Sequence, residues 1–420
     1  MKRFFVFFIF YITSIILFAG NPGIKVFSLH NGVKVLLLKV KENPVIACTV
    51  VVKTGLKYEN KKTNGISHLL EHLMFNGTEK RTQDELYRDF DTISCYNNAS
   101  TSDHYTAYYI VSPEENFKEA LEILSDMLFH STIPDDKFEK EKGIVVEEIR
   151  KDRVSPVFYE EMAFRRVVFA GTPYAMKVIG TEKSVNSLKR KDVIEYYKRY
   201  YSPENMVILV AGDYEEKELT RWLEHYFGSV KPVKIEKKSF NLKWGKSFYE
   251  IKERRLPYSV FYYVIKGVRA DSDGFPYQEA YSILLENRLR PLLMGFDPSF
   301  SVSTDYTDDY GLIKIRLKVK SRDEALKSKK IIQKQITKID FITSQSVKAV
   351  KTSLKAESIF ALERPHFFGM IESPFLAAGC NKILIYREIN FNSLIAFAKK
   401  VKNFESISVF VEGGKNEMVR

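Results

Sequence analysis

The feature that most constrains the fold is a strand-like pattern that occurs twice. A proline precedes an apolar, β-branched run at residues 45–52, and another precedes a similar run at 258–265. Each run is followed by a glycine and a helical pattern, and one more strand-like run lies near the end of each half, at 206–212 and 407–413. This regularity favours a duplicated unit of mixed strands and helices, with two unrelated α+β domains as the alternative.

We therefore expect an α+β fold of two similar domains, each a mainly antiparallel sheet packed with helices. The expected N-terminal domain covers residues 22–230, and the C-terminal domain covers 247–420. The polar stretch 231–246 between them is the predicted linker.

Helical patterns are clearest in the first half. Thr82 and Glu85 have the spacing of a capping box. Residues 114–129 carry an apolar stripe with helical spacing, which predicts an amphipathic helix. Residues 135–150 begin with two acidic residues directly after a proline, which is typical of the N-terminus of a helix.

The amino terminus has the pattern of an export signal. Lys2 and Arg3 precede an uncharged, apolar stretch at 4–19, and small residues follow. This predicts a signal peptide at 1–20, or an uncleaved anchor that associates with a membrane through residues 4–19. In both cases we expect an exported protein, periplasmic or extracellular.

Composition excludes several classes. Lys and Arg exceed Asp and Glu by 65 − 53 = 12, but no basic run is interleaved with aromatics, so we expect no nucleic-acid partner. The three cysteines, Cys48, Cys95 and Cys380, show no paired spacing. This argues against a disulfide scaffold and a cysteine-ligated zinc site.

The chemistry is concentrated in the pentapeptide HLLEH. On a helix, His68 and His72 lie on one face one turn apart, where both imidazoles can bind one Zn²⁺. Glu71 lies beside them and can accept a proton from the attacking water. An ordinary helix with surface or core histidines is the alternative, so the site needs a third ligand.

Glu148 is the candidate third ligand. Glu141 and Glu148 are seven residues apart, hence nearly aligned on a helix, in line with Ile144 and Val145. A carboxylate in an apolar stripe costs free energy unless it meets a cation, whereas Glu147 projects toward a charged face. Glu141 is a candidate acceptor for an imidazole N–H. A solvated acidic helix remains the alternative.

Several ordered motifs resemble the insulinase or pitrilysin family of zinc metallopeptidases. They are VKTG…NGISHLLEHLMFNGT, NNASTSDHYTAYY, EKGIVVEEIRKDRVSP, GTPYAMKVIGTEKSV and YYKRYYSPENMVILVAGDY. The resemblance is strong over about residues 26–230 and weak in the second half. The length is similar to that of half-size members, which pair as dimers to build a closed chamber.

The resemblance implies a role for each matching residue. The implied zinc ligands are His68, His72 and Glu148. Glu71 is implied as general base and Glu141 as the supporting acid. Asn98 and Ala99 match the sheet edge on which an extended substrate docks by backbone pairing.

The second half departs from the family pattern. Met294 and Phe300 occupy the positions of an Arg and a Tyr that bind substrate and stabilise the oxyanion, and neither side chain can donate a hydrogen bond. Tyr277 and Tyr281 occupy the positions of His68 and His72, so we expect no zinc there. Arg290 or Tyr306 are alternatives for the missing pair.

These observations predict an exported zinc endopeptidase that cleaves extended or unfolded peptides. We expect a heterodimer with a homologous subunit that supplies the Arg and Tyr, or else a homodimer. The alternative is a scaffold or assembly subunit that keeps the metal site but is inactive alone. A membrane-anchored peptide-binding module is a third reading, which depends only on the N-terminal segment.

Overall fold

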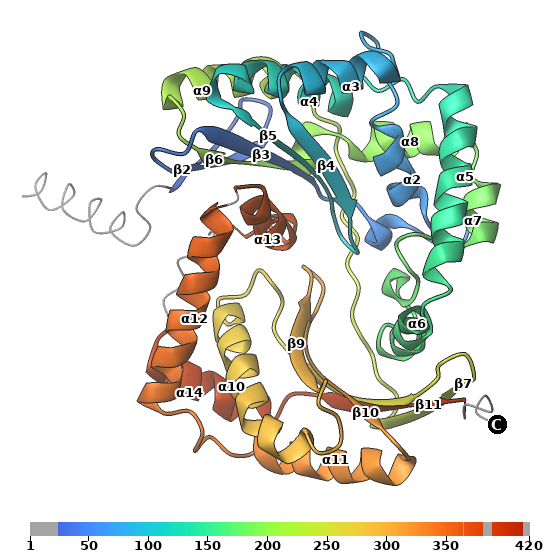
Figure 1. Ribbon diagram of the computed structural model, residues 1–420, viewed down its shortest axis with the longest axis vertical. Coiled ribbons are helices and arrows are strands. Elements are labelled where there is room, and N and C mark those ends of the chain that lie inside the picture. The colour runs from blue at the N-terminus through green and yellow to red at the C-terminus, as the bar shows by residue number, and fades with distance from the viewer. Residues whose placement is uncertain (1–23, 364, 381–388, 415–420) are drawn as a thin grey trace, which may run out of the picture.

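The computed structural model describes residues 24–363, 365–380 and 389–414, in two layered units that each contain one sheet (Figure 1). The predicted signal segment, residues 1–20, lies outside the described residues. Within the described ranges, no helix has the length and apolar character needed to cross a bilayer.

The first sheet has the strand order β1-β2-β6-β3-β5-β4. Its strands are β1 (Ile24–Ser28), β2 (Lys34–Lys39), β3 (Val45–Val52), β4 (Tyr96–Thr101), β5 (Thr106–Pro113) and β6 (Met206–Gly212). The second sheet has the order β7-β11-β8-β10-β9. Its strands are β7 (Phe248–Glu253), β8 (Ser259–Lys266), β9 (Ser301–Tyr306), β10 (Gly311–Val319) and β11 (Ser406–Gly413).

The two sheets share one topology. In the first, β3 runs antiparallel to β5 and β6, and β6 runs parallel to β2. In the second, β8 runs antiparallel to β10 and β11, and β11 runs parallel to β7. The predicted α+β fold of two similar, mainly antiparallel units is therefore confirmed.

Helices pack with the sheet in both halves. Those of the first half are α2 (Ile66–Leu73), α3 (Gln83–Thr92), α4 (Phe117–Phe129), α5 (Asp135–Asp152), α6 (Pro156–Val168), α7 (Glu182–Ser187), α8 (Arg190–Tyr200) and α9 (Glu216–Leu223). Those of the second half are α10 (Phe275–Leu293), α11 (Arg322–Ile336), α12 (Ser344–Glu363), α13 (Pro365–Ala377) and α14 (Phe391–Val401).

Local sequence explains where these elements begin. Thr82 and Glu85 form the predicted capping box of α3. The helix predicted at 114–129 begins three residues later, because 114–116 form a 3₁₀ turn before the buried stripe of α4. The helix predicted at 135–150 continues to Asp152 as α5.

One helix of each half packs against the sheet of the other half. Figure 1 shows α6 beside β7 and β11 of the second sheet, and α13 against the first sheet, where it contacts β3, β5 and β6. The ring of Phe164 in α6 lies 4.7 Å from that of Tyr262 in β8. Phe368 in α13 is fully buried against the first sheet. Neither sheet is therefore covered by its own half alone.

The predicted linker contains neither helix nor strand between residues 231 and 246. It is nevertheless packed on the protein. Ile235 joins the core of the first sheet and Leu242 joins the cluster under the second. The indole Nε1 of Trp244 donates to the carbonyl oxygen of Val168 at 2.9 Å.

Candidate metal centre

Helix α2 presents the HLLEH motif toward α5. Its apolar positions Ile66, Leu69, Leu70 and Leu73 are buried in the core of the first half. Because the helix is amphipathic, this burial turns His68, Glu71 and His72 to the opposite, partly accessible side. The α5 helix packs alongside and brings its acidic residues to the same place (Figure 1).

The two histidines and Glu148 converge. Glu148 Oε2 lies 3.9 Å from His68 Nε2 and 3.7 Å from His72 Nε2. One donor atom from each residue lies within 4.8 Å of the others. Among the described residues, this is the one such group of three His, Cys, Asp or Glu side chains. Two imidazoles and one carboxylate form the protein donor set of a catalytic zinc site.

Glu141 holds the second histidine. Its Oε2 lies 3.1 Å from His72 Nδ1, and the carboxylate is nearly buried. Burial opposes charge on His72, but the bond to Glu141 and the nearby carboxylates outweigh it and raise the pKa of His72. Burial likewise acts to raise the pKa of Glu141, and its hydrogen bond to His72 more than offsets this and lowers it. The hydrogen bond between Glu141 and His72 Nδ1 orients the imidazole ring so that its Nε2 faces Glu148.

His68 differs from its neighbour. Burial, followed by the proximity of His72, lowers the pKa of His68 to about 4. The ring is therefore neutral at physiological pH, as a metal ligand must be. Its Nδ1 is buried with no hydrogen-bond partner among the described residues. A neutral imidazole beside a second imidazole and a carboxylate fits a zinc ion.

Glu71 contacts a residue that the sequence did not single out. The hydroxyl of Thr101, at the end of β4, donates to Glu71 Oε2. Burial raises the pKa of Glu71, and the bond from Thr101 opposes part of that shift. A carboxylate with a raised pKa is suited to accept and return a proton near neutral pH. No spacing in the sequence links Thr101 to Glu71, because the contact arises from the placement of β4 beside α2.

The surroundings of Glu147 and Glu148 agree only in part with the helical pattern of the sequence. Glu147 does face solvent, with Arg150 Nη1 at 2.5 Å. Ile144, however, is 38% exposed and the Glu148 side chain is 41% exposed, so Glu148 does not lie in a buried apolar stripe. Glu148 is distinguished instead by its approach to the two histidines.

The predicted docking residues lie on the outermost strand of the first sheet. Asn98 and Ala99 belong to β4, which pairs with β5 on one side. The backbone N–H of Ala99 donates to Asn98 Oδ1 at 2.8 Å, and Asn98 Nδ2 donates to the Tyr96 hydroxyl at 3.0 Å. The same strand leads directly to Thr101 and hence to Glu71.

The second half lacks an equivalent centre among its described residues. Tyr281 is buried in the core of the second sheet and Tyr277 packs against it. Met294 is 54% exposed at the end of α10, whereas Phe300 is 3% exposed within the core. Arg290 forms an ion pair with Glu286, and Tyr306 stacks on Phe375.

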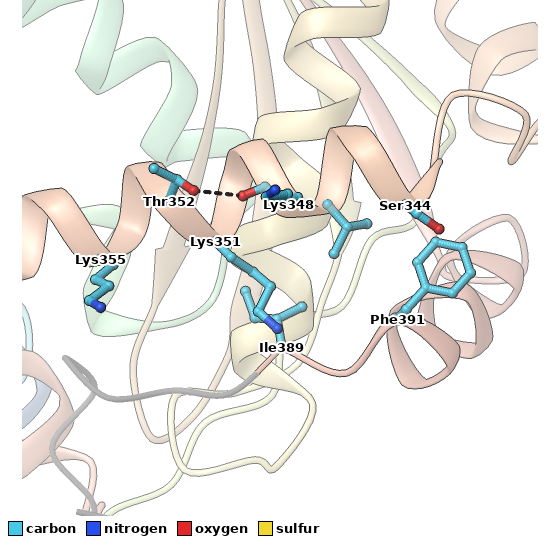
Figure 2. Close-up of a pocket in the computed structure, with 8 residues that line it drawn as sticks. Ser344, Lys348, Lys351, Thr352, Lys355, Ile389 and Phe391 are labelled. Carbon is cyan, nitrogen blue, oxygen red and sulfur yellow. Dashed lines mark hydrogen bonds between the residues drawn. The ribbon is translucent and has the colours of Figure 1, made fainter.

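A surface hollow on the second half has different chemistry. Figure 2 shows Lys348, Lys351 and Lys355 along α12, with Ser344 and Phe391 at one end. The hollow has a volume of about 360 Å³, and its lining contains no His, Cys, Asp or Glu. The candidate centre therefore remains on α2 and α5.

Comparison with known proteins places this geometry in context. Residues 34–182 match the profile of Insulinase (Peptidase family M16), and residues 187–354 match that of the Peptidase M16 inactive domain. A relative from Bacillus subtilis, named "uncharacterized zinc protease YmxG", is 33% identical over 224 residues, which cover 52% of this chain and 54% of that protein. The mitochondrial-processing peptidase subunit beta of Saccharomyces cerevisiae is 30% identical over 212 residues, covering 50% and 45%.

The chain thus spans about half the length of these relatives. Two solved structures share the fold over nearly the whole chain. A protease from Helicobacter pylori has a TM-score of 0.80 at 21% identity, covering 93% of this chain and 100% of that one. The first half of the periplasmic protease PqqL from Escherichia coli has a TM-score of 0.75 at 17% identity, covering 95% and 93%. Since profiles of one family match both halves, the protein belongs to the insulinase family, peptidase family M16.

Proposed function

We propose that this protein is a zinc-dependent endopeptidase that cleaves extended or unfolded peptides. One observation carries the proposal: His68, His72 and Glu148 converge on one point with Glu71 beside them. A structural cluster of histidines would not need a buried carboxylate next to the ligand set. Family membership agrees with this chemistry, and the relatives that are named zinc proteases support the choice of metal.

Each residue has a distinct task in this proposal. His68, His72 and Glu148 would hold the zinc, which when bound supplies Lewis acidity toward a carbonyl and lowers the pKa of water. Glu71 accepts a proton from the attacking water and passes it to the leaving amine. Thr101 holds the carboxylate of Glu71 in place, and Glu141 holds the ring of His72.

The outermost strand β4 offers a way to bind the substrate. An extended peptide can add to such an edge through main-chain hydrogen bonds, with little demand on its sequence. For Ala99 to take part, its N–H must exchange the side chain of Asn98 for a substrate carbonyl. Because β4 ends at Thr101, a peptide on this edge would run past Glu71. Most backbone N–H and C=O groups of a folded protein are already paired, which favours extended or unfolded substrates.

Substitution of Glu71 tests the catalytic assignment. We expect Glu71→Gln to retain bound zinc and to lose cleavage of an unstructured, fluorescence-quenched peptide by at least about a hundredfold, as expected for a lost general base. The matched control is Glu147→Gln on the solvent side of α5, which should cleave normally. Normal cleavage by Glu71→Gln, or unchanged zinc content in His72→Ala, would contradict the proposal.

We further propose that a second subunit completes the site. Met294 and Phe300 cannot stabilise an oxyanion, so a homologous subunit, or a second copy of this chain, would supply an Arg and a Tyr. Several relatives are named as subunits, which is consistent with pairing. We expect weak cleavage by the chain alone and faster cleavage with a homologous partner. If every mixture remains inert while zinc is bound, the scaffold function is the better description.

The proposed site of action is outside the cytoplasm. This part of the proposal rests on the charged, apolar and small-residue pattern of residues 1–20. Fractionation of cells that express the full chain, compared with a chain lacking residues 2–19, would test it. Retention of both in the cytoplasm would contradict export.

A further inference from the structure

Helix α2 begins without a capping side chain of its own. Its N-cap residue is Gly65, with φ of 96° and no side chain to accept the first backbone N–H groups. Glu59, six residues earlier, takes that role from outside the helix. Its Oε2 accepts from the backbone N–H of Gly65 at 2.8 Å, and its Oε1 accepts from that of Ser67 at 3.0 Å.

The environment of Glu59 is unusual for a carboxylate. The residue is 2% exposed, and its third donor is the neutral amide Nδ2 of Asn64 at 3.0 Å. Burial raises the pKa of Glu59, although the hydrogen bonds from Asn64, Gly65 and Ser67 oppose the shift. The positive end of the helix dipole also favours a carboxylate here. Burying a carboxylate costs free energy, so its retention here indicates that the hydrogen-bond geometry of Glu59 is needed at the start of α2.

A second contact fixes the same turn. The hydroxyls of Ser67 and Tyr196 are 2.8 Å apart, and that of Tyr196 is 2.7 Å from Thr54 Oγ1. Ser67 directly precedes His68 in the chain. The first turn of α2 is therefore held at two points. Glu59 binds the backbone of the turn, and Tyr196 binds the side chain of Ser67.

Close packing removes other ways of seating the helix. A Cβ atom at Gly65 would lie 2.9 Å from the carbonyl oxygen of Ile179 and 3.1 Å from the Cα of Gly180. The start of α2 thus lies directly on the segment before α7. A shift of this first turn would move His68 and His72 relative to Glu148.

We propose that Glu59 is a positioning residue for the metal centre. Together with the buried apolar face of α2, it fixes the first turn of the helix, so that His68 and His72 meet Glu148 and Glu71 meets Thr101. Glu59 touches neither the ligands nor the general base, and it acts through the backbone of Gly65 and Ser67. The inference rests on the proposed zinc function, which it deepens by naming the residue that sets the geometry of the site.

The test compares Glu59→Gln with wild type in the full chain. The amide nearly preserves shape, but it can place only one oxygen against the two N–H groups. We expect zinc affinity, measured by competition with a chelator, to fall about tenfold, the lower end of the effect of supporting residues in metal sites. With Co²⁺ in place of zinc, we expect the visible absorption spectrum to change, which a loss of stability alone would not cause.

Two further variants make the result decisive. Glu85→Gln makes the same carboxylate-to-amide change at the start of another helix, in the capping box of α3, away from the site. It should leave zinc affinity within about twofold of wild type, since the effect of a helix cap is local. Glu59→Asp keeps the charge but withdraws the carboxylate by one methylene, and it should also weaken zinc binding. It serves as the test if Glu59→Gln does not fold.

The outcomes separate the two proposals. If wild type binds zinc and folded Glu59 variants bind it equally, with an unchanged Co²⁺ spectrum, the positioning role is wrong and the zinc function stands. If wild type binds no zinc that depends on His72, both are wrong. Weaker binding by both Glu59 variants, with Glu85→Gln unaffected, supports the inference.

Discussion

His68 and His72 lie one turn apart on one helix, yet their surroundings move their pKa values in opposite directions. Burial dominates at His68 and lowers its pKa to about 4. At His72, burial is outweighed by the bond to Glu141 and by nearby carboxylates, so the pKa rises. Since metal ligation requires the neutral ring, His72 is the ligand for which protons compete as the pH falls.

Glu141→Gln tests this assignment. The substitution removes the charge that supports protonated His72, so the pKa of His72 should fall. We expect zinc affinity at neutral pH to decrease about tenfold, because the supporting carboxylate is lost. We also expect the break in a plot of log Kd against pH to move to lower pH. Chelator competition across a pH series measures both, with Glu147→Gln as the control. A break at the wild-type pH would contradict the role of Glu141.

At the scale of elements, the exchanged helix α6 is fastened to the second sheet by one carboxylate. Glu160 accepts from Arg316 Nε at 2.6 Å and Nη2 at 2.9 Å. The hydroxyls of Tyr258 and Tyr262 donate to the same carboxylate. Burial acts to raise the pKa of Glu160, but Arg316 and the two tyrosines more than offset it, so the pKa is lowered.

We expect Glu160→Ala to lower the free energy of unfolding by about 3 kcal/mol, because Arg316 loses the carboxylate that accepts both of its short hydrogen bonds and keeps the more distant Asp297, at 3.9 Å. A lowered carboxyl pKa contributes stability that is present above the ordinary carboxyl pKa and is lost as the pH falls through the folded value. The difference between variant and wild type should therefore be full near pH 7 and shrink in acid below the ordinary value of 4.5. Urea unfolding of both proteins, at pH 7 and again below pH 4.5, measures this difference in stability.

The control is Glu218→Gln, which breaks the exposed pair with Arg221 on α9. It should change stability by less than about 1 kcal/mol. A similarly small effect of Glu160→Ala would show that the carboxylate does not fasten α6.

Local patterns predicted much of the fold because they report local energetics. The β-branched runs at 45–52 and 206–212 match β3 and β6 residue for residue, since both strands are buried along nearly their whole length. The run at 258–265 is displaced by one residue from β8, and the run at 407–413 starts one residue after the start of β11 and ends with it, within the usual uncertainty of strand ends.

Tertiary placement produced the features that the sequence did not predict. Thr101 reaches Glu71 only because β4 lies beside α2, and no periodicity encodes that contact. Ile144 follows the helical period of a buried stripe, yet it is exposed because no element covers that part of α5. The exchange of α6 and α13 has no local signal, since the apolar residues of a helix do not specify which sheet they will meet.

For the whole molecule, this exchange joins the two halves. In α13, a Cβ atom at Gly369 would lie 1.9 Å from Thr49 Oγ1, so the helix backbone lies directly on β3. Lys57, which is nearly buried, lies 2.7 Å from a carboxylate oxygen of Asp308 and 3.1 Å from one of Asp309. Separating the halves would expose the apolar surfaces between α6 and the second sheet and between α13 and the first sheet. It would also leave the buried charge of Lys57 unpaired, which is strongly unfavourable.

We therefore expect the halves to remain together without the covalent link. A protease site inserted at the exposed residues 237–239 would cut the chain between Ile235 and Leu242, which stay packed on their respective sheets. After cleavage, the fragments should co-elute in gel filtration, keep their zinc and unfold in one transition, because each sheet still carries the helix of the other half. Independent domains would instead separate or melt in two steps. Dissociation of the nicked protein under native conditions would mean that α6 and α13 contribute little to holding the halves together.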